Sequence, residues 1–211
     1  MNKKYDYKID ESWIYSMDSN QPKIINLQPQ KFITITGKGS PNDDEYKEKS
    51  KVLYSIAHYI KNIEQKPQLW FNYEIWPLEI FWTLTDDFNW YFDQSRLIYK
   101  MMIKQPDFVN ADMLSFYINQ FIDEIGNKEI ASQVKLEIVG ESMVSQILHT
   151  GYFETEPKTF AILDEWLYKQ GFARIEKNIH KEIYLINSNN NDQTFVPKTI
   201  LRSRVKQKEI K

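Results

Sequence analysis

The chain contains two short segments in which a single acid is set inside an apolar, aromatic, strand-forming run. Residues 77–82 read PLEIFW and residues 180–185 read HKEIYL. A carboxylate is costly in such surroundings unless it is exposed or serves a function. One acid of this kind can arise by chance, whereas two in matching surroundings favour a duplicated fold with a paired functional centre.

The pattern around these segments predicts the same order of elements twice. In the first half, a β-branched run over 31–37 predicts a strand, helical spacing predicts a helix over 46–63, and two strands follow over 71–84 and 90–103. In the second half, strands are predicted over 142–150, 179–186 and 199–205, with a helix over 156–170. The order is therefore β-α-β-β in each half.

We accordingly expect an α+β fold made of tandem β-α-β-β repeats with pseudo-twofold symmetry. Its antiparallel sheet would carry the helices on one face and a central ligand cleft on the other. The expected organisation is an N-terminal lead-in over 1–31, one domain over 32–205 and a charged tail over 206–211. Within the domain, repeat one spans 32–104, a linking helix lies in 106–126, and repeat two spans 135–205.

Composition excludes several classes of function. The chain has no cysteine, which removes disulfides, thiolate catalysis and cysteine-ligated zinc. Its net charge is −2 with both signs interspersed, so no basic stripe favours direct nucleic-acid binding. Neither a signal core nor a run of roughly 20 apolar residues is found, which predicts a cytoplasmic protein without membrane contact. We expect no cofactor and no metal site, and the oligomeric state is not encoded in any pattern we can read.

Side-chain alternation predicts which residues share a face of the sheet. In the second segment Glu182 and Tyr184 share one face, and the aliphatic Ile183 and Leu185 share the other, which suits a packed helix. The same parity places Glu79 with Phe81. Glu79 and Glu182 would then flank one cleft on the face away from the helices. The alternative, two exposed acids on a solvated sheet face, stays open at this point.

The sequence also resembles the GyrI-like (gyrase-inhibitor-like) family of small-molecule-binding proteins, over about residues 30–205. The matching residues are His149-Thr150-Gly151-Tyr152, Leu163-Asp164-Glu165-Trp166-Leu167, Gly171-Phe172, Lys181-Glu182-Ile183-Tyr184-Leu185, Thr199-Ile200-Leu201, residues 32–42, and Pro77-Leu78-Glu79 with Trp82. The resemblance implies tandem β-α-β-β units around a cleft with a central glutamate, whose position Glu182 occupies. Members include drug-binding domains of transcription regulators and stand-alone hydrolases of cyclopropane-bearing, DNA-alkylating compounds.

Two functions follow as expectations. The first is a hydrolase that opens an activated cyclopropane with water, with Glu182 as the base and Tyr184 as a hydroxyl donor to the developing charge. The second is a non-catalytic binder of lipophilic cations; a gyrase-inhibitor-like interaction protein is a further alternative. In each case the partner is a small aromatic molecule or a protein. The predicted ligand-binding residues are Glu79, Phe81, Trp82, Trp90, Trp70, His149 and Tyr152.

Overall fold

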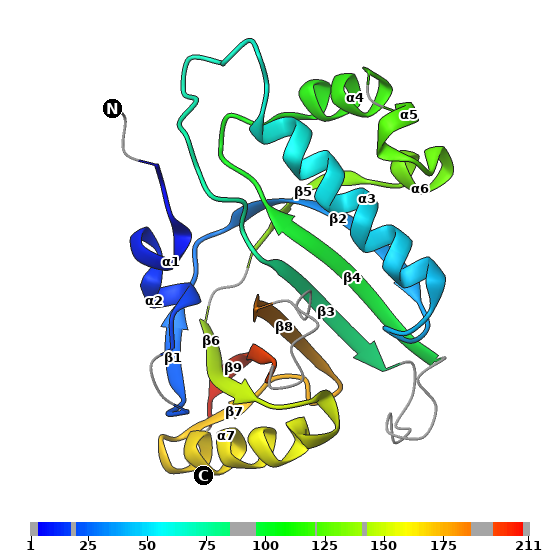
Figure 1. The fold of residues 1–211 in the computed structure, drawn as a ribbon. Coiled ribbons are helices and arrows are strands. Elements are labelled where there is room, and N and C mark those ends of the chain that lie inside the picture. The colour runs from blue at the N-terminus through cyan, green and yellow to red at the C-terminus, as the bar shows by residue number, and fades with distance from the viewer. Residues whose placement is uncertain are drawn as a thin grey trace.

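The predicted β-α-β-β order is found twice in the computed structural model, which describes residues 4–17, 20–84, 96–120, 122–140, 143–186 and 196–208 (Figure 1). Repeat one consists of β2 (Gln30–Lys38), α3 (Asp44–Lys61), β3 (Leu78–Leu84) and β4 (Leu97–Lys104). Repeat two consists of β6 (Met143–Thr150), α7 (Glu156–Lys169), β8 (Ile179–Ile186) and β9 (Lys198–Gln207). The fold is thus α+β with an antiparallel sheet, as the sequence predicts.

Shorter elements surround the two repeats. Two helical turns and a strand precede them, three short helices and a strand connect them, and a 3-10 turn and a short strand lie inside the second repeat. In chain order these are α1 (Tyr7–Asp10), α2 (Ser12–Tyr15), β1 (Lys23–Asn26), α4 (Ala111–Gln120), α5 (Ile122–Ile125), α6 (Lys128–Ser132), β5 (Lys135–Val139), the 3-10 turn Phe153–Thr155 and β7 (Phe172–Arg174). The predicted linking helix is therefore a pair of helices, α4 and α5.

The sheet shows the expected pseudo-symmetry. Its strands are ordered β1-β6-β9-β8-β3-β4-β2-β5, with β7 paired to β9. The three strands of repeat two, β6-β9-β8, mirror β2-β4-β3 of repeat one, and the repeats meet where β3 pairs with β8 in antiparallel fashion. The central strands of the sheet are therefore the two that carry the acids.

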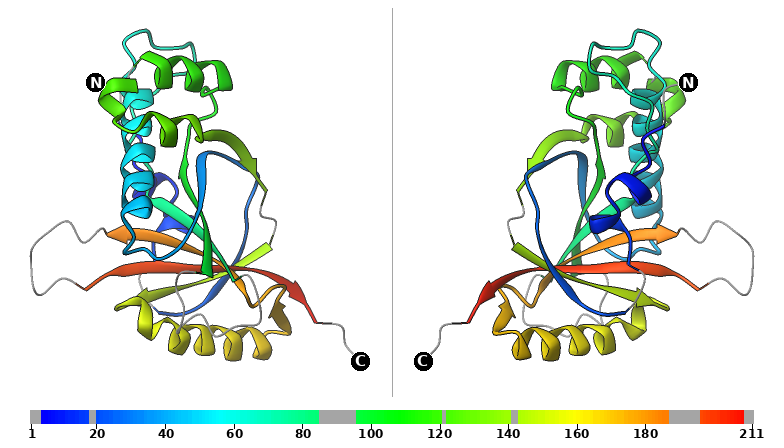
Figure 2. Two further views of the ribbon diagram at one scale, coloured as in Figure 1. Left: turned by 90° about the vertical axis from the view of Figure 1, so that its right-hand side faces the viewer. Right: turned by 90° about the vertical axis from the view of Figure 1, so that its left-hand side faces the viewer.

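One face of the sheet is covered by the two long helices. The apolar stripe of α3 packs on β2, β3 and β4, with Ile56 and Ile80 both in that core. The stripe of α7 packs on β6 and β9, with Leu163 and Leu201 both in a second core. The helices lie apart from one another in Figure 2, so each repeat supplies its own helix-on-sheet layer.

The opposite face carries a third core, formed with the N-terminal segment. Ile14 and Tyr15 of α2 pack there with Tyr73 and Trp76, against Ile183 of β8. Residues ahead of the repeats therefore contribute buried side chains to the middle of the sheet. Since these apolar residues leave water together, the segment is part of the folded unit.

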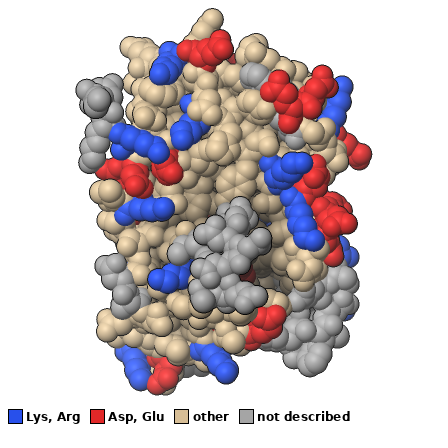
Figure 3. Space-filling view, viewed as in Figure 1, with Lys and Arg blue, Asp and Glu red and all other residues tan. Residues whose placement is uncertain are grey.

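Charged residues give no single-signed surface on the face shown in Figure 3, where blue and red side chains are interspersed, mostly toward the margins. Within the described ranges, no helix combines the length and apolar character that crossing a bilayer requires.

Gly37 of β2 is expected to resist substitution because of a close ring contact. A Cβ at this position would lie 2.3 Å from the Tyr99 ring, and Tyr99 is buried. Gly37→Ala should therefore lower the free energy of unfolding by about 1–3 kcal/mol through overpacking. Urea unfolding would measure the loss, and the control is Gly140→Ala, where nothing lies within 4 Å of the added Cβ. Equal stability of the two variants would contradict the expectation.

Candidate functional site

Glu182 lies on the helix-covered face of the sheet. Its cross-strand neighbours are Ile80 of β3 and Leu201 of β9, which belong to the cores under α3 and α7 respectively. The prediction that Glu182 faces away from the helices is therefore wrong. The aliphatic residues of β8 instead pack against the N-terminal segment. The apolar residues of that segment follow no helix or strand period, so the sequence does not predict this packing.

The Glu182 carboxylate is held by two neighbours on its own strand. The Tyr184 hydroxyl donates a hydrogen bond to Oε2, and His180 Nε2 lies 3.0 Å from Oε1. Residues two apart on a strand point to the same side, which explains why all three side chains meet. Glu182 is only 7% exposed, so the carboxylate is positioned by protein groups.

Tyr184 remains a hydrogen-bond donor over the whole physiological range. Burial, followed by the charge of Glu182, raises the pKa of Tyr184 well above its usual value. The pKa of Tyr46 on α3 is raised for the same two reasons, and its hydroxyl is hydrogen-bonded to Tyr184. The two phenols are therefore neutral groups beside a carboxylate, and neither can act as the base.

Aromatic packing fixes Tyr46 above the sheet. Its ring stacks on Trp82 with centroids 6.0 Å apart and planes 8° from parallel, and it meets Tyr99 edge-on. Trp82 is itself buried in the α3 core. The structure thus places Trp82 on the Glu182 face, as a support for Tyr46.

A second acid, Glu156, enters the site from α7. Glu156 is the first residue of that helix and is 2% exposed. Burial first, and then the charge and hydrogen bond of Glu182, raise the pKa of Glu156 to about 10. Sequence analysis did not select Glu156, because its only local signal is a helix start before Pro157.

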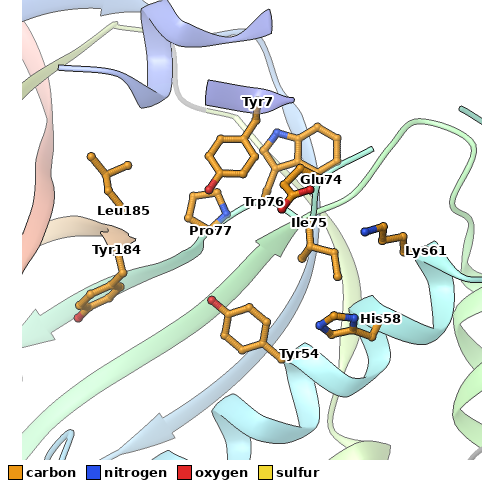
Figure 4. A pocket seen from close by; sticks show the side chains of 10 residues that line it. All are labelled: Tyr7, Tyr54, His58, Lys61, Glu74, Ile75, Trp76, Pro77, Tyr184 and Leu185. Carbon is orange, nitrogen blue, oxygen red and sulfur yellow. The ribbon is translucent and has the colours of Figure 1, made fainter. Parts of the chain in front are cut away.

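Glu156, His180, Glu182 and Tyr184 together form what we call the carboxylate cluster. A cavity of about 220 Å³ adjoins this cluster, and Tyr184 lines it (Figure 4). It lies between α3, α1, the segment before β3 and the end of β8. Four aromatic side chains and several charged or aliphatic ones line it: Tyr7, Tyr54, Trp76, Tyr184, His58, Lys61, Glu74, Ile75, Pro77 and Leu185. The Tyr184 ring faces this space while its hydroxyl contacts Glu182, so a ligand in the cavity would lie beside the carboxylate cluster.

Glu79 lies on the opposite face of the sheet from Glu182. Its cross-strand neighbour is Ile183, and it is fully buried against Lys181 and Tyr15. The prediction that the two acids flank one cleft is therefore wrong.

The register of β3 against β8 explains why. Paired residues in these strands have numbers that sum to 262, as in Glu79 with Ile183 and Ile80 with Glu182. Two numbers with an even sum are both odd or both even, so paired residues on β3 and β8 that share a face of the sheet have the same parity. A pseudo-twofold axis normal to the sheet places each residue of β3 over a residue of β8 on the same face. The numbers of equivalent residues must therefore differ by an even amount. The two acids differ by 182 − 79 = 103, which is odd, so Glu79 is not the structural equivalent of Glu182.

The other predicted ligand-binding residues lie outside the carboxylate cluster. Phe81 is on the Glu79 face, where the Lys181 ammonium sits 4.5 Å from its ring centroid. Trp70 is in the loop before β3, with Lys66 4.0 Å from its ring. His149 is buried with both ring nitrogens in local contacts, to Thr159 and to the carbonyl of Tyr152. The side chain of Tyr152 is exposed. Trp90 falls outside the described residues.

Among the described residues, one group has the spacing that a metal ion would need. Donor atoms of Glu156, His180 and Glu182 all lie within 4.8 Å of one another. A metal ion there would balance the negative charge of Glu156 and Glu182, and a proton shared by the two carboxyl groups would lower that charge as well.

The fold is shared with proteins of known structure. No protein-family model and no curated protein matches the chain. An uncharacterized conserved protein from Listeria innocua is 28% identical, with a TM-score of 0.86 over 96% of this chain and 100% of that one. A hydrolase from Listeria innocua is 27% identical, with a TM-score of 0.85 over 97% of this chain and 100% of that one. The C-terminal domain of EcmrR shares the fold at 11% identity, with a TM-score of 0.52 over 89% of this chain and 98% of that domain.

Proposed function

We propose that this protein is a GyrI-like hydrolase that binds flat, lipophilic aromatic molecules and opens an activated cyclopropane ring with water. The observation that carries the proposal is the buried Glu182 carboxylate, held by Tyr184 and His180 next to a cavity with aromatic walls. Full-length similarity to a hydrolase of Listeria innocua supports it.

The charges of the site suit a general base. Glu182 receives hydrogen bonds, and among the described residues its ion-pair partner is His180 and no lysine or arginine, so it has no partner of permanent charge. In the proposed reaction Glu182 takes a proton from water as the water oxygen bonds to a cyclopropane carbon. The strained carbon–carbon bond breaks, and its electron pair moves through the conjugated system to a carbonyl oxygen. Glu182 then gives up its proton and the oxygen takes one, so Glu182 is regenerated and the net reaction is the addition of one water molecule.

Two neutral phenols support the base. Tyr184 and Tyr46 stay protonated, and each side chain is half-buried. The single O–H of Tyr184 is donated to Glu182, so Tyr184 holds the base in place and does not donate to the developing oxyanion. We assign Tyr184 the dual role of holding Glu182 and presenting its ring to the ligand.

The cavity limits the ligand. A space of about 220 Å³ lies below the usual range for ligand pockets, which is roughly 300–1,000 Å³. It fits one flat ring system between the rings that line it, with the rest of a larger molecule extending outward. Aromatic stacking on Tyr and Trp walls would orient that ring system.

The test is turnover in oxygen-18-labelled water with a cyclopropane-bearing aromatic compound as the substrate. We expect a ring-opened product that carries one labelled oxygen, formed catalytically. Disappearance of the compound through covalent attachment to the protein, or no reaction above the rate without protein, would overturn the proposal.

One observation favours a second candidate, a passive binder of lipophilic cations. The cavity is lined by four aromatic rings and by Glu74, whose pKa is lowered chiefly by its hydrogen bond with Lys4. Aromatic faces attract cations by roughly 0.5–2 kcal/mol each. This candidate predicts saturable binding of a cationic dye without turnover, and weaker binding in Glu74→Gln.

A further inference from the structure

The carboxylate cluster contains two buried acids and no permanent cation. Glu156 and Glu182 are each less than 10% exposed, and no lysine or arginine in the described part of the chain forms an ion pair with either. Two ionised carboxylates in such a site repel one another and lack water to screen the repulsion. At neutral pH the pair is therefore stable only if a proton or another cation joins it.

The hydrogen-bond donors decide which acid carries the charge. Tyr184 and His180 both contact Glu182, whereas no N–H or hydroxyl donor of the described residues reaches the buried Oε2 of Glu156. Donors stabilise an ionised carboxylate, and a carboxylate without donors is better neutral. The asymmetry therefore leaves the charge on Glu182 and the proton on Glu156.

One feature of α7 opposes this assignment. Glu156 is at the helix N-terminus, where the helix dipole favours an anion by about 0.3–1 kcal/mol, and by up to about 2 when partly buried. Burial of an ion costs several kcal/mol, and the neighbouring charge of Glu182 adds to that cost. Glu154 in the preceding 3-10 turn adds a further negative charge. The groups that face Glu156 from β8, Glu182, His180 and Tyr184, supply no fixed positive charge, so the neutral form prevails.

We propose that Glu156 is the proton-holding partner of Glu182, a neutral carboxyl group that donates its O–H to the Glu182 carboxylate. Glu156 is then a positioning residue: it keeps its proton throughout, fixes one oxygen of Glu182, and leaves Glu182 as the group that exchanges protons. The consequence for catalysis rests on the proposed hydrolase function. The protonation state does not, because it follows from the free protein.

Infrared spectroscopy of the substrate-free protein, stripped of metals with a chelator, tests the assignment. At pH 8 we expect the carbonyl band of a protonated carboxyl group, which Glu156→Gln abolishes and the matched control Glu154→Gln retains. A band that survives in Glu156→Gln but is lost in Glu182→Gln would place the proton on the wrong acid. Absence of the band in the wild type, or a chelator-resistant divalent ion lost in Glu156→Gln, would also overturn the proposal.

Stability against pH gives an independent readout. The pKa of Glu156 rises from an ordinary value of 4.5 to about 10 on folding, so the neutral form favours the folded state. This contribution is complete below pH 4.5 and is lost as the pH rises toward 10. Over that window the unfolding equilibrium constant of the wild type should rise by up to about tenfold per pH unit relative to Glu156→Gln. Parallel profiles for the two proteins would contradict the proposal.

Neither measurement uses a substrate, so a failure here is distinguishable from a failure of the hydrolase function. Where turnover is found, the amide of Glu156→Gln still offers an N–H donor to Glu182, and Glu156→Leu offers none. We therefore expect the loss in kcat to be larger for Leu than for Gln, and equal losses would count against a hydrogen-bonding role.

Discussion

Replacing Glu182 by Gln is expected to lower kcat for ring opening by a factor of about 10²–10⁴, the usual contribution of a positioned general base. The amide has nearly the shape of the carboxylate and its oxygen can still accept from Tyr184, but it cannot take a proton from water. Binding of the aromatic ligand should be nearly unchanged, because the cavity is lined by other residues. The measurements are kcat with the cyclopropane substrate and Kd from a binding titration.

The matched control is Glu137→Gln. Glu137 is another sheet glutamate, on β5, where it is held by Thr34 of β2 and Lys100 of β4. We expect its turnover to stay close to that of the wild type. Full turnover in Glu182→Gln would show that Glu182 is not the base, and loss of both kcat and ligand binding would show a mainly structural role.

Replacing Lys181 by Met is expected to destabilise the fold by about 3–5 kcal/mol, because it removes one partner of a buried ion pair. Lys181 Nζ lies 3.0 Å from Oε2 of Glu79, and the two side chains are 2% and 0% exposed. Tyr15 donates to the other oxygen of Glu79 at 2.9 Å. Without Lys181, Glu79 would keep its charge in a dry interior or take up a proton. Urea unfolding at pH 7 measures the loss.

A double-mutant cycle separates the lost pair from a general packing defect. Glu79→Gln removes the charge and still accepts from Tyr15, so Glu79→Gln with Lys181→Met should recover most of the stability lost in Lys181→Met alone. Lys169→Met is the exposed control, because it breaks a surface pair with Glu165 that solvent screens and that contributes little to stability. The prediction fails if Lys181→Met costs no more than Lys169→Met.

The ion pair between Lys181 and Glu79 stabilises the packing of the N-terminal segment against the face of β8 opposite Glu182. Burial opposes ionisation of Glu79, but the charges of Lys181 and Arg202 outweigh it, so the pKa of Glu79 lies below its ordinary value of 4.5. Because the folded-state pKa is lowered, this stabilisation is present above pH 4.5 and is lost as the pH falls below it. On β8, Lys181 points to one face of the sheet, and its neighbours His180 and Glu182 point to the other. The ion pair of Lys181 therefore also fixes the position of the strand that carries Glu182.

Much of the fold could be predicted from the sequence, because the relevant signals are local. The 3.6-residue period of α3 and α7 and the two-residue alternation of β8 are set by neighbouring side chains. These patterns gave the predicted range of β8, and the ranges of the two helices within about two residues at each end. The partition of β8 into two faces was also right, since Glu182 and Tyr184 do share one of them.

The composition of the site could be predicted only in part. Glu182 and Tyr184 meet because they are two apart on one strand, which is a local relation. Glu156 and Tyr46 reach the same point from two helices in different repeats, and nothing near them in the sequence indicates that meeting. The cavity beside them requires α1, α3 and β8 to be assembled first.

The two acid-bearing segments separate what local sequence patterns predict from what depends on the packing of distant segments. Residue periodicity is enough to predict that the chain builds β-α-β-β twice and that each acid lies inside a strand. Periodicity does not predict which face each acid occupies: in the folded protein Glu182 faces the helices, and Glu79 is buried with Lys181 on the opposite side. The physical reason is register: side chains alternate with a period of two, so a shift of one residue in the pairing of β3 with β8 moves a carboxylate from one face of the sheet to the other.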